Sequence, residues 1–262
     1  MRSTSKTLEK KSIKIVVIIP SRYCSSRFEG KPLAMIAGKP MIQRVCERAK
    51  LASNISDVVV ATDDKRIFDA VLEFGGKVII TSVENRSGTD RVGEAAEIMG
   101  LAMDDVIVNI QGDQPLMEPA CLDQLTTPFF YDPKPDISTL AFKIIRKEER
   151  TDPKDVKVTF DKNGNALYFS RSPIPYARDV STVFDMYKHL GFYAYTRSFL
   201  EIFRKLPEGQ LEHLEKLEQL RVLEHGYGLR VVVTEYDSPE VDLPDDIVRV
   251  ERILRTQRGL VW

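Results

Sequence analysis

The amino-acid sequence predicts an α/β fold with a doubly wound, mostly parallel β-sheet. Short runs of branched apolar residues, which are typical of strands buried on both faces, alternate with amphipathic helical segments as far as residue 116. The first apolar run, at 15–19, leads straight into Pro20 and a polar loop. Because alternating strands and helices form right-handed crossovers between parallel strands, we expect one sheet with helices on both faces.

The first half of the chain supplies four of the expected strands and three of the expected helices. Two of these helices end at glycines, Gly75-Gly76 and Gly100, which are common helix stops. In chain order, the expected strands are 15–19, 57–64, 77–82 and 105–116, and the expected helices are 41–52, 65–76 and 89–100.

The segment 137–197 differs from what precedes it, because alternating polar and apolar residues and aromatic residues become more frequent. Asn163-Gly164 favours a tight hairpin turn within this segment. We therefore expect an antiparallel, β-rich insertion at 137–197. Helices are expected to follow at 198–206 and 210–226.

The helix expected at 210–226 carries a stripe of leucines that should pack in the core: Leu211, Leu214, Leu217 and Leu220. A last strand is expected at 230–236, and Pro244 suits the start of a closing helix. We expect residues 1–12 to be a flexible tail and residues 13–262 to form a single domain.

Composition excludes several classes of protein. With 43% hydrophobic and 29% charged residues among 262, the chain has the composition of a globular protein, and its net charge of −1 suggests neither a nucleic-acid nor a membrane partner. No apolar run approaches the length of a membrane span. The three cysteines, Cys24, Cys46 and Cys121, show no zinc-ligand spacing, and their odd number argues against a disulfide framework. We expect a protein of the cytoplasm, where thiols stay reduced.

Charged residues gather after the predicted strands, which is where open α/β sheets bind ligands. The first strand leads into a loop with three cations, Arg22, Arg27 and Lys31, and Gly30 can adopt the backbone conformation that a tight loop requires. Asp113 directly follows the fourth strand, and Asp242 lies in a loop near the end of the chain. Two converging carboxylates can hold Mg²⁺ against the oxygens of a triphosphate while the cations neutralise the remaining charge.

Plainer interpretations remain open for these residues. The basic loop is also compatible with a solvated surface loop, and each aspartate with a turn or helix cap. The loop is not a phosphate-binding loop of the Walker type, since Pro32 follows Gly30-Lys31, and the chain has no dinucleotide-binding glycine pattern. An ATPase or an NAD-dependent enzyme is therefore disfavoured.

Eight motifs, in order, give the chain a resemblance to a known family. They are IPSRYCSSRFEGKPL, VVVATDD, SGTDR, NIQGDQP, ALYFSRSPIP, YKHLGFYAYT, LEKLEQLRVLEHG and EVDLPDD. Together they span about residues 14–255 and resemble the 3-deoxy-manno-octulosonate (Kdo) cytidylyltransferases, the CMP-Kdo synthetases. The resemblance implies a Rossmann-like fold of the nucleotide-diphospho-sugar transferase type. It also implies that the anomeric hydroxyl of Kdo attacks the α-phosphorus of CTP, giving CMP-Kdo and pyrophosphate for lipopolysaccharide biosynthesis.

The resemblance also implies roles for individual residues. Arg22, Arg27 and Lys31 match the triphosphate-binding loop, and with Asp113 they are the predicted catalytic residues. Asp113 and Asp242 match the Mg²⁺ ligands, and Ser87 and Arg91 border the cytidine. The residues that match contacts to the acid sugar are Gln111, Arg171, His189, Glu212 and Gln219. The β-rich insertion resembles the dimerisation region of the family, so that a homodimer is expected.

Two of these assignments keep alternatives. Arg171 would suit a bidentate contact with the sugar carboxylate, but an exposed strand arginine fits the pattern as well. His189, between Lys188 and Leu190, also fits a histidine whose hydrogen bonds are satisfied within the core.

The chain departs from the family pattern at three places. Glu29 stands where proline is usual, QGDQP replaces QGDEP through Gln114, and VDLPDD replaces VDTPED. Gln114 removes a negative charge beside Asp113, which would alter metal binding or the sugar pocket. Because some members of the family that the chain resembles are associated with 8-amino-3,8-dideoxy-manno-octulosonate (8-amino-Kdo), that sugar is an alternative substrate, and sialic acid is a more distant one. A regulatory module that binds a nucleotide without turnover is the alternative outside enzymes.

Overall fold

The computed structural model describes residues 13–24, 28–179 and 181–258 of the chain. The predicted tail at 1–12 and the predicted site residue Arg27 therefore lie outside the described residues. The strands of the central sheet are β1 (Ile15–Ser21), β4 (Asp57–Thr62), β5 (Lys77–Ile80), β6 (Val106–Asn109), β7 (Ile137–Lys143), β8 (Lys157–Phe160), β9 (Ala166–Ser170), β10 (Tyr187–Thr196) and β11 (Arg230–Thr234). A small ribbon pairs β2 (Met35–Ile36) with β3 (Lys39–Pro40).

Helices cover the sheet and its edges. The α-helices are α1 (Met41–Ala49), α2 (Lys65–Glu73), α3 (Gly88–Ile98), α4 (Pro119–Thr126), α5 (Arg197–Phe203), α6 (Gln210–Glu215), α7 (Leu220–Glu224) and α8 (Pro244–Arg258). Three short 3₁₀ helices are η1 (Lys31–Leu33), η2 (Thr127–Phe130) and η3 (Glu148–Arg150). None of the helices in the described part of the chain combines the length and apolar character needed to cross a bilayer.

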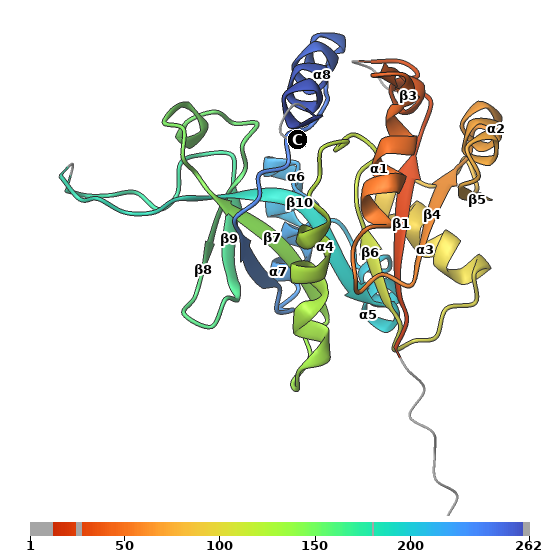
Figure 1. The fold of residues 1–262 in the computed structure, drawn as a ribbon. Coiled ribbons are helices and arrows are strands. Elements are labelled where there is room, and N and C mark those ends of the chain that lie inside the picture. The colour runs from red at the N-terminus through yellow and green to blue at the C-terminus, as the bar shows by residue number, and fades with distance from the viewer. Residues whose placement is uncertain (1–12, 25–27, 180, 259–262) are drawn as a thin grey trace, which may run out of the picture.

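The strands of the central sheet, within the described ranges, have the spatial order β11-β7-β10-β6-β1-β4-β5 and form a mixed sheet, with β8 and β9 joined to it through β10 (Figure 1). The half that contains β6, β1, β4 and β5 is parallel, as predicted. Side chains of β1 alternate between two cores. Val17 and Ile19 belong to the core that includes residues of α1 and α4, whereas Val16 and Ile18 belong to the core that includes α3 and α5. The expectation of helices on both faces is thus confirmed.

The β-rich segment at 137–197 is part of this same sheet. Strand β10 pairs antiparallel with both β6 and β7, and its register with β7 shifts between His189 and Tyr193. Strands β8 and β9 form a hairpin beside it, and the predicted turn is present, with Gly164 at a φ of 80°. Between β9 and β10 the chain projects well away from the sheet (Figure 1).

The single helix expected at 210–226 is two short helices, and the prediction of a continuous leucine stripe is wrong. Lys216 adopts a left-handed conformation with a φ of 54°, which ends α6. Leu217 and Leu220 are buried, but Leu214 is 69% exposed. The break places Glu218 and Gln219 in a turn that is not part of either helix.

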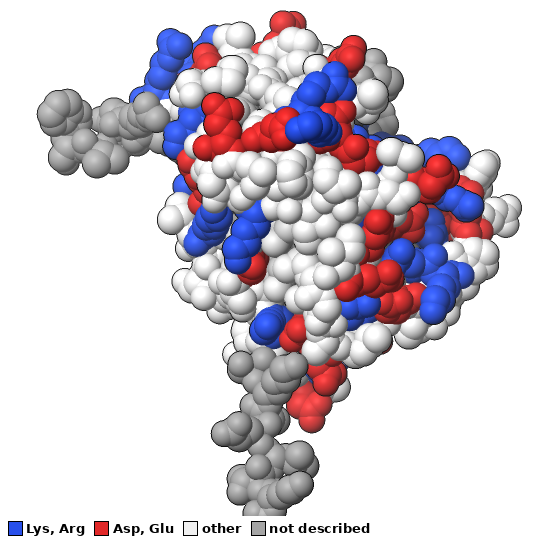
Figure 2. Space-filling model, turned by 90° about the vertical axis from the view of Figure 1, so that its right-hand side faces the viewer, with Lys and Arg blue, Asp and Glu red and all other residues white. Residues whose placement is uncertain are grey.

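The face that carries α2 and α3 has a mixed distribution of charge. Figure 2 shows basic and acidic side chains interspersed around a broad uncharged area on this face. A mixed surface of this kind produces no extended field of one sign.

The left-handed residue at the end of α6 gives a first prediction. Replacing Lys216 by glycine should raise the free energy of unfolding by about 0.5–1 kcal/mol, because glycine adopts this conformation without the steric cost that a Cβ carries. Lys216→Ala, which keeps the Cβ, is the control and should give no such gain. Chemical denaturation of the two variants measures the difference, and equal stabilities would contradict the explanation.

Candidate functional site

A cavity of about 210 Å³ lies at the carboxyl ends of β1 and β6. It is lined by Pro20, Ser21, Arg22, Cys24, Lys31, Pro32, Gly88, Gln111, Gly112 and Asp113. Two of these residues are glycines, and the space at Gly112 is limited, because a Cβ there would come within 3.2 Å of Ser21 Oγ. This is the edge of the sheet where ligands bind in open α/β folds.

The loop after β1 returns to this cavity through a compact turn. The Gly30 amide donates to the Tyr23 carbonyl oxygen at 2.9 Å, and Gly30 has a φ of 69°. The Arg66 guanidinium lies 3.2 Å from the centroid of the Tyr23 ring, which fixes the loop against α2. Lys31 begins η1 directly after this turn, so that the glycine sets where the lysine points.

Lys31 joins three distant segments of the chain. Its Nζ donates to Asp113 Oδ2 at 2.6 Å and to the Val241 carbonyl oxygen at 3.0 Å, and lies 3.7 Å from Asp242 Oδ1. The two aspartates predicted as metal ligands are thus brought to one side chain, although 129 positions separate them in the sequence.

The carboxylates of Asp113 and Asp242 fit a hard divalent cation. Asp113 Oδ1 is buried and, among the described residues, has no hydrogen-bond partner. A buried carboxylate oxygen without a donor is costly, whereas such an oxygen is a good ligand for Mg²⁺. The donor set therefore suits the predicted ion.

The other predicted contacts to the nucleotide occupy different positions. Arg22 is exposed at the cavity, and its Nη2 donates to the Asn85 carbonyl oxygen at 2.8 Å. Ser87 caps α3 by accepting from the Asp90 amide at 3.0 Å, and Gly88, the next residue, lines the cavity.

Arg91 lies behind the cavity and does not line it. It is fully buried, and its guanidinium donates to Asp63 Oδ2 at 2.6 Å and to Thr81 Oγ1 at 2.5 Å. These contacts connect α3 to the residues that follow β4 and β5. In this arrangement Arg91 holds the residues that follow β4 and β5 in place.

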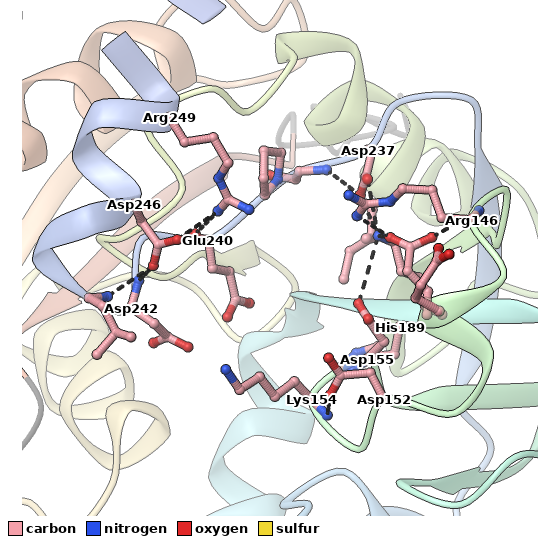
Figure 3. Close-up of a pocket in the computed structure, with 17 residues that line it drawn as sticks. Arg146, Asp152, Lys154, Asp155, His189, Asp237, Glu240, Asp242, Asp246 and Arg249 are labelled. Carbon is pink, nitrogen blue, oxygen red and sulfur yellow. Dashed lines mark hydrogen bonds and ion pairs between the residues drawn. The ribbon is translucent and has the colours of Figure 1, made fainter. Parts of the chain in front are cut away.

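A second, larger cavity of about 580 Å³ lies between the segment 237–246, which includes the start of α8, the η3 region and β10 (Figure 3). Charged residues dominate its lining, and most of them are paired with one another. Lys188 Nζ donates to Glu149 Oε1 at 2.6 Å and to Asp237 Oδ2 at 3.0 Å. Asp242 lines this cavity while its carboxylate lies 3.7 Å from Lys31, which lines the first, so that the two cavities meet at the Lys31 contacts.

Glu240 projects into the second cavity near this junction (Figure 3). Desolvation, together with the charges of Asp113 and Asp242, raises the pKa of its carboxyl to about 7. Gln114 Nε2 donates to Glu240 Oε1 at 3.3 Å. Glu240 belongs to the acidic EVDLPDD motif, but the sequence did not single it out.

His189 borders the second cavity from β10. Its Nε2 lies 2.9 Å from Thr139 Oγ1, and that hydroxyl itself donates to the Phe192 carbonyl oxygen at 2.6 Å. The imidazole therefore donates through Nε2 and leaves Nδ1 as an acceptor. Burial lowers the pKa of His189 to about 3, so the ring is neutral near pH 7.

Among the other predicted sugar contacts, Gln111 lines the first cavity, and two residues already have protein partners. Arg171 Nε donates to the Glu215 carbonyl oxygen at 2.7 Å, and its Nη1 donates to the Pro153 carbonyl oxygen at 2.9 Å. Glu212 forms a bidentate ion pair with Arg221 at 2.5 and 2.7 Å. In this arrangement Arg171 and Glu212 are held by the fold.

Gln219 is buried, and its Nε2 has no hydrogen-bond partner among the described residues. The adjacent Glu218 accepts from Thr89 Oγ1 at 2.7 Å, and burial raises the pKa of its carboxyl. Burial raises the pKa of the Tyr193 phenol, and the charges of Tyr195 and Glu218 contribute to this rise. The sequence did not single out Glu218, because a continuous helix was expected where the structure has the turn that contains this residue.

Comparisons with known proteins agree on one family. The sequence profile described as cytidylyltransferase matches residues 16–234. A 3-deoxy-manno-octulosonate cytidylyltransferase of Desulfatibacillum aliphaticivorans is 60% identical over 245 residues, which cover 94% of this chain and 100% of that protein. An 8-amino-3,8-dideoxy-manno-octulosonate cytidylyltransferase of Shewanella piezotolerans is 56% identical over 234 residues, 89% of this chain and 95% of that protein.

A solved structure, CMP:2-keto-3-deoxy-manno-octonic acid synthetase complexed with CTP, is also similar. It superposes with a TM-score of 0.88 at 41% identity, and the match covers 93% of this chain and 99% of that one.

The half-buried His189 gives a prediction about pH. Because the pKa of His189 in the folded state, about 3, lies below its unfolded value of roughly 6.5, the unfolded chain binds a proton first as the pH falls. The free energy of unfolding should decrease from about pH 6.5 downward, by at most about 1.4 kcal/mol per pH unit from this group.

His189→Gln, whose amide retains a donor for Thr139, does not titrate and is the matched variant. Denaturant titrations between pH 7 and 5 should show a steeper loss for the unmodified protein than for this variant. Parallel pH profiles would show that His189 is not held neutral by the fold.

Proposed function

The chain belongs to the 3-deoxy-manno-octulosonate cytidylyltransferase family, and from this premise we propose that it transfers the cytidylyl group of CTP to Kdo or a close analogue. The anomeric hydroxyl of the sugar forms a bond to the α-phosphorus and loses its proton, while the bond from that phosphorus to the oxygen of the β-phosphate breaks. The products are a CMP-sugar and pyrophosphate. We further propose that the CMP-sugar serves lipopolysaccharide biosynthesis.

The observation that carries this proposal is the contact of Lys31 with both Asp113 and Asp242. It places an ammonium group and two carboxylates at the point where the two cavities meet. Phosphoryl-group transfer depends mainly on positioning and on neutralising charge, and these groups serve both purposes. Asp113 and Asp242 would hold Mg²⁺, and that ion would neutralise phosphate charge and orient the triphosphate.

The first cavity is the proposed nucleotide site. Lys31 and Arg22 line it and would neutralise phosphate oxygens, and Arg27 is proposed to act with them. The amino end of α3, capped by Ser87, opens at Gly88 onto this cavity, where its free amides favour an anion. Arg91 would act indirectly, by holding the strand ends in place.

The acid sugar is proposed to lie beyond the Lys31 contacts, next to Gln111 and His189. A neutral His189 with an unprotonated Nδ1 can accept a hydrogen bond from a sugar hydroxyl. Gln219, whose buried amide nitrogen lacks an acceptor, is a second proposed contact. We propose that Arg171 stabilises the end of β9 and that Glu212 stabilises the turn after α6. Their charged groups are already bound to protein partners.

The reaction is proposed to take place in the cytoplasm. Cys24, Cys46 and Cys121 are free thiols, and such thiols persist in a reducing compartment.

Removal of a metal ligand tests the proposed chemistry. Asp113→Asn should lower the rate of pyrophosphate release from CTP, Mg²⁺ and Kdo at least about 100-fold, because the amide cannot supply the charge that the ion requires. Asp245→Asn is the matched control, since Asp245 is an exposed acid near Asp242 that lines neither cavity. Full activity in Asp113→Asn would overturn the assignment. If the protein binds CTP but releases no pyrophosphate with any acid sugar, a regulatory module is the better description.

We also propose that the protein is a homodimer joined through the β-rich region. Large apolar side chains are exposed there, with Tyr176 at 89% and Val183 at 98%, and a second copy of the chain would cover them. Light scattering at micromolar concentration should give twice the mass of the chain. Combined Tyr176→Glu and Val183→Glu substitutions should shift the mass toward that of one chain, whereas a single-chain mass before substitution would contradict the proposal.

A further inference from the structure

Gln114 and Glu240 form a contact in the wall of the second cavity. Gln114 is only 1% exposed, and its Nε2 donates both to the Leu190 carbonyl oxygen, at 3.1 Å, and to Glu240 Oε1, at 3.3 Å. Glu240 also lies against Gly191, where a Cβ would stand 3.9 Å from Oε1. The amide therefore holds the Glu240 carboxylate next to Leu190 and Gly191 of β10, the two residues that follow His189.

Glu240 forms no ion pair among the described residues, whereas several other carboxylates of the cavity do. Lys188 is paired with Glu149 and Asp237, and Arg249 is paired with Asp246 at 3.2 Å. In Figure 3 the Glu240 carboxylate points into the open space of the cavity. Its carboxyl oxygens are thus available to a ligand.

A shared metal ion does not account for this charge. In the described part of the chain, no three acidic, histidine or cysteine side chains are grouped so that they could hold one ion. Asp113 and Asp242 are the pair that fits Mg²⁺, and Glu240 lies in the wall of the second cavity, which Asp242 also lines.

The charge of the whole lining favours a ligand that carries a cation. Eight carboxylates and four lysine or arginine side chains line the cavity, and His189 is neutral. A sugar whose only charge is a carboxylate meets an excess of like charge there. An ammonium group on the sugar reduces this repulsion and can form a charge-assisted hydrogen bond with an unpaired carboxylate.

On the basis of the proposed function, we propose that Glu240 is the counter-ion for an amino group on the sugar and that Gln114 is its positioning residue. The preferred substrate is then 8-amino-Kdo, with an amine in place of the hydroxyl at C8. Overall similarity does not decide this point, because relatives named for each of the two sugars match the chain almost equally well.

The amide at position 114 explains how Glu240 is held as an acceptor. The glutamate that is usual in the family would place a second carboxylate about as close to Glu240 Oε1 as the 3.3 Å of the present contact, and would face the Leu190 carbonyl oxygen without a proton to donate. Gln114 supplies the donor without adding charge. It therefore keeps Glu240 oriented and free to accept from a substrate.

The test compares kcat/KM for Kdo and for 8-amino-Kdo, measured by pyrophosphate release with CTP and Mg²⁺. The unmodified protein should favour the amino sugar by about 10- to 100-fold, which is the usual range for one hydrogen bond to a charged group. Glu240→Gln should remove most of this preference, mainly by raising KM for the amino sugar. Glu235→Gln, an exposed acid on the same segment that lines neither cavity, should keep the preference.

Gln114→Glu is the second variant, with thermal unfolding as the check on folding. It should also reduce the preference through KM for the amino sugar, since a purely structural role would affect both sugars equally. Equal or better use of Kdo by the unmodified protein would overturn this inference and leave the proposed function intact, as would an unchanged preference in Glu240→Gln. Absence of pyrophosphate with both sugars would overturn the proposed function, and this inference with it.

Discussion

The contact of Lys31 with Asp113 and Asp242 is the interaction on which the arrangement of the site depends. Two carboxylates without a cation nearby repel each other, and the Lys31 ammonium, 2.6 Å from one and 3.7 Å from the other, allows them to stay together. The same ammonium binds the Val241 carbonyl oxygen, so that it also holds the chain just before α8. One half-buried lysine thus joins the loop after β1, the loop after β6 and the C-terminal segment.

The sheet determines where these segments can meet. The parallel strands β1 and β6 end at one edge, which places the basic loop beside Asp113. Strand β10 then runs antiparallel next to β6 and brings His189 and Leu190 to the same edge from the other direction. The register shift in β10 lies between His189 and Tyr193, and the Leu190 carbonyl within that stretch accepts from Gln114. The β-rich segment therefore contributes directly to the wall of the site.

The sequence predicted the elements whose patterns are local. Branched apolar runs identified the parallel strands, and Asn163-Gly164 identified the hairpin. The polar clusters after the strands indicated Lys31 and Asp113 as site residues, because the carboxyl ends of parallel strands lie at the same edge of a sheet. The break at Lys216 was not visible, because a lysine carries no signal for a left-handed conformation and the leucine spacing continues through it. Contacts such as Gln114 with Leu190, which are 76 positions apart, depend on the completed sheet.

The contacts that each polar side chain makes were the feature least predictable from the sequence. By these contacts the predicted site residues fall into two groups. Arg91, Arg171 and Glu212 bind protein partners through their charged groups, although Arg91 Nε has no partner among the described residues. Asp113 Oδ1 and Gln219 Nε2 are buried without partners among the described residues. Leaving such a group unpaired costs about 1–3 kcal/mol, and a fold retains that cost where a bound molecule later completes the interaction. For Asp113, which lines the first cavity, this unmet hydrogen-bonding capacity supports a role in binding a ligand. Arg91 Nε is also buried without a partner among the described residues but lines neither cavity, so unmet capacity identifies a ligand-facing residue only together with its position in a cavity wall.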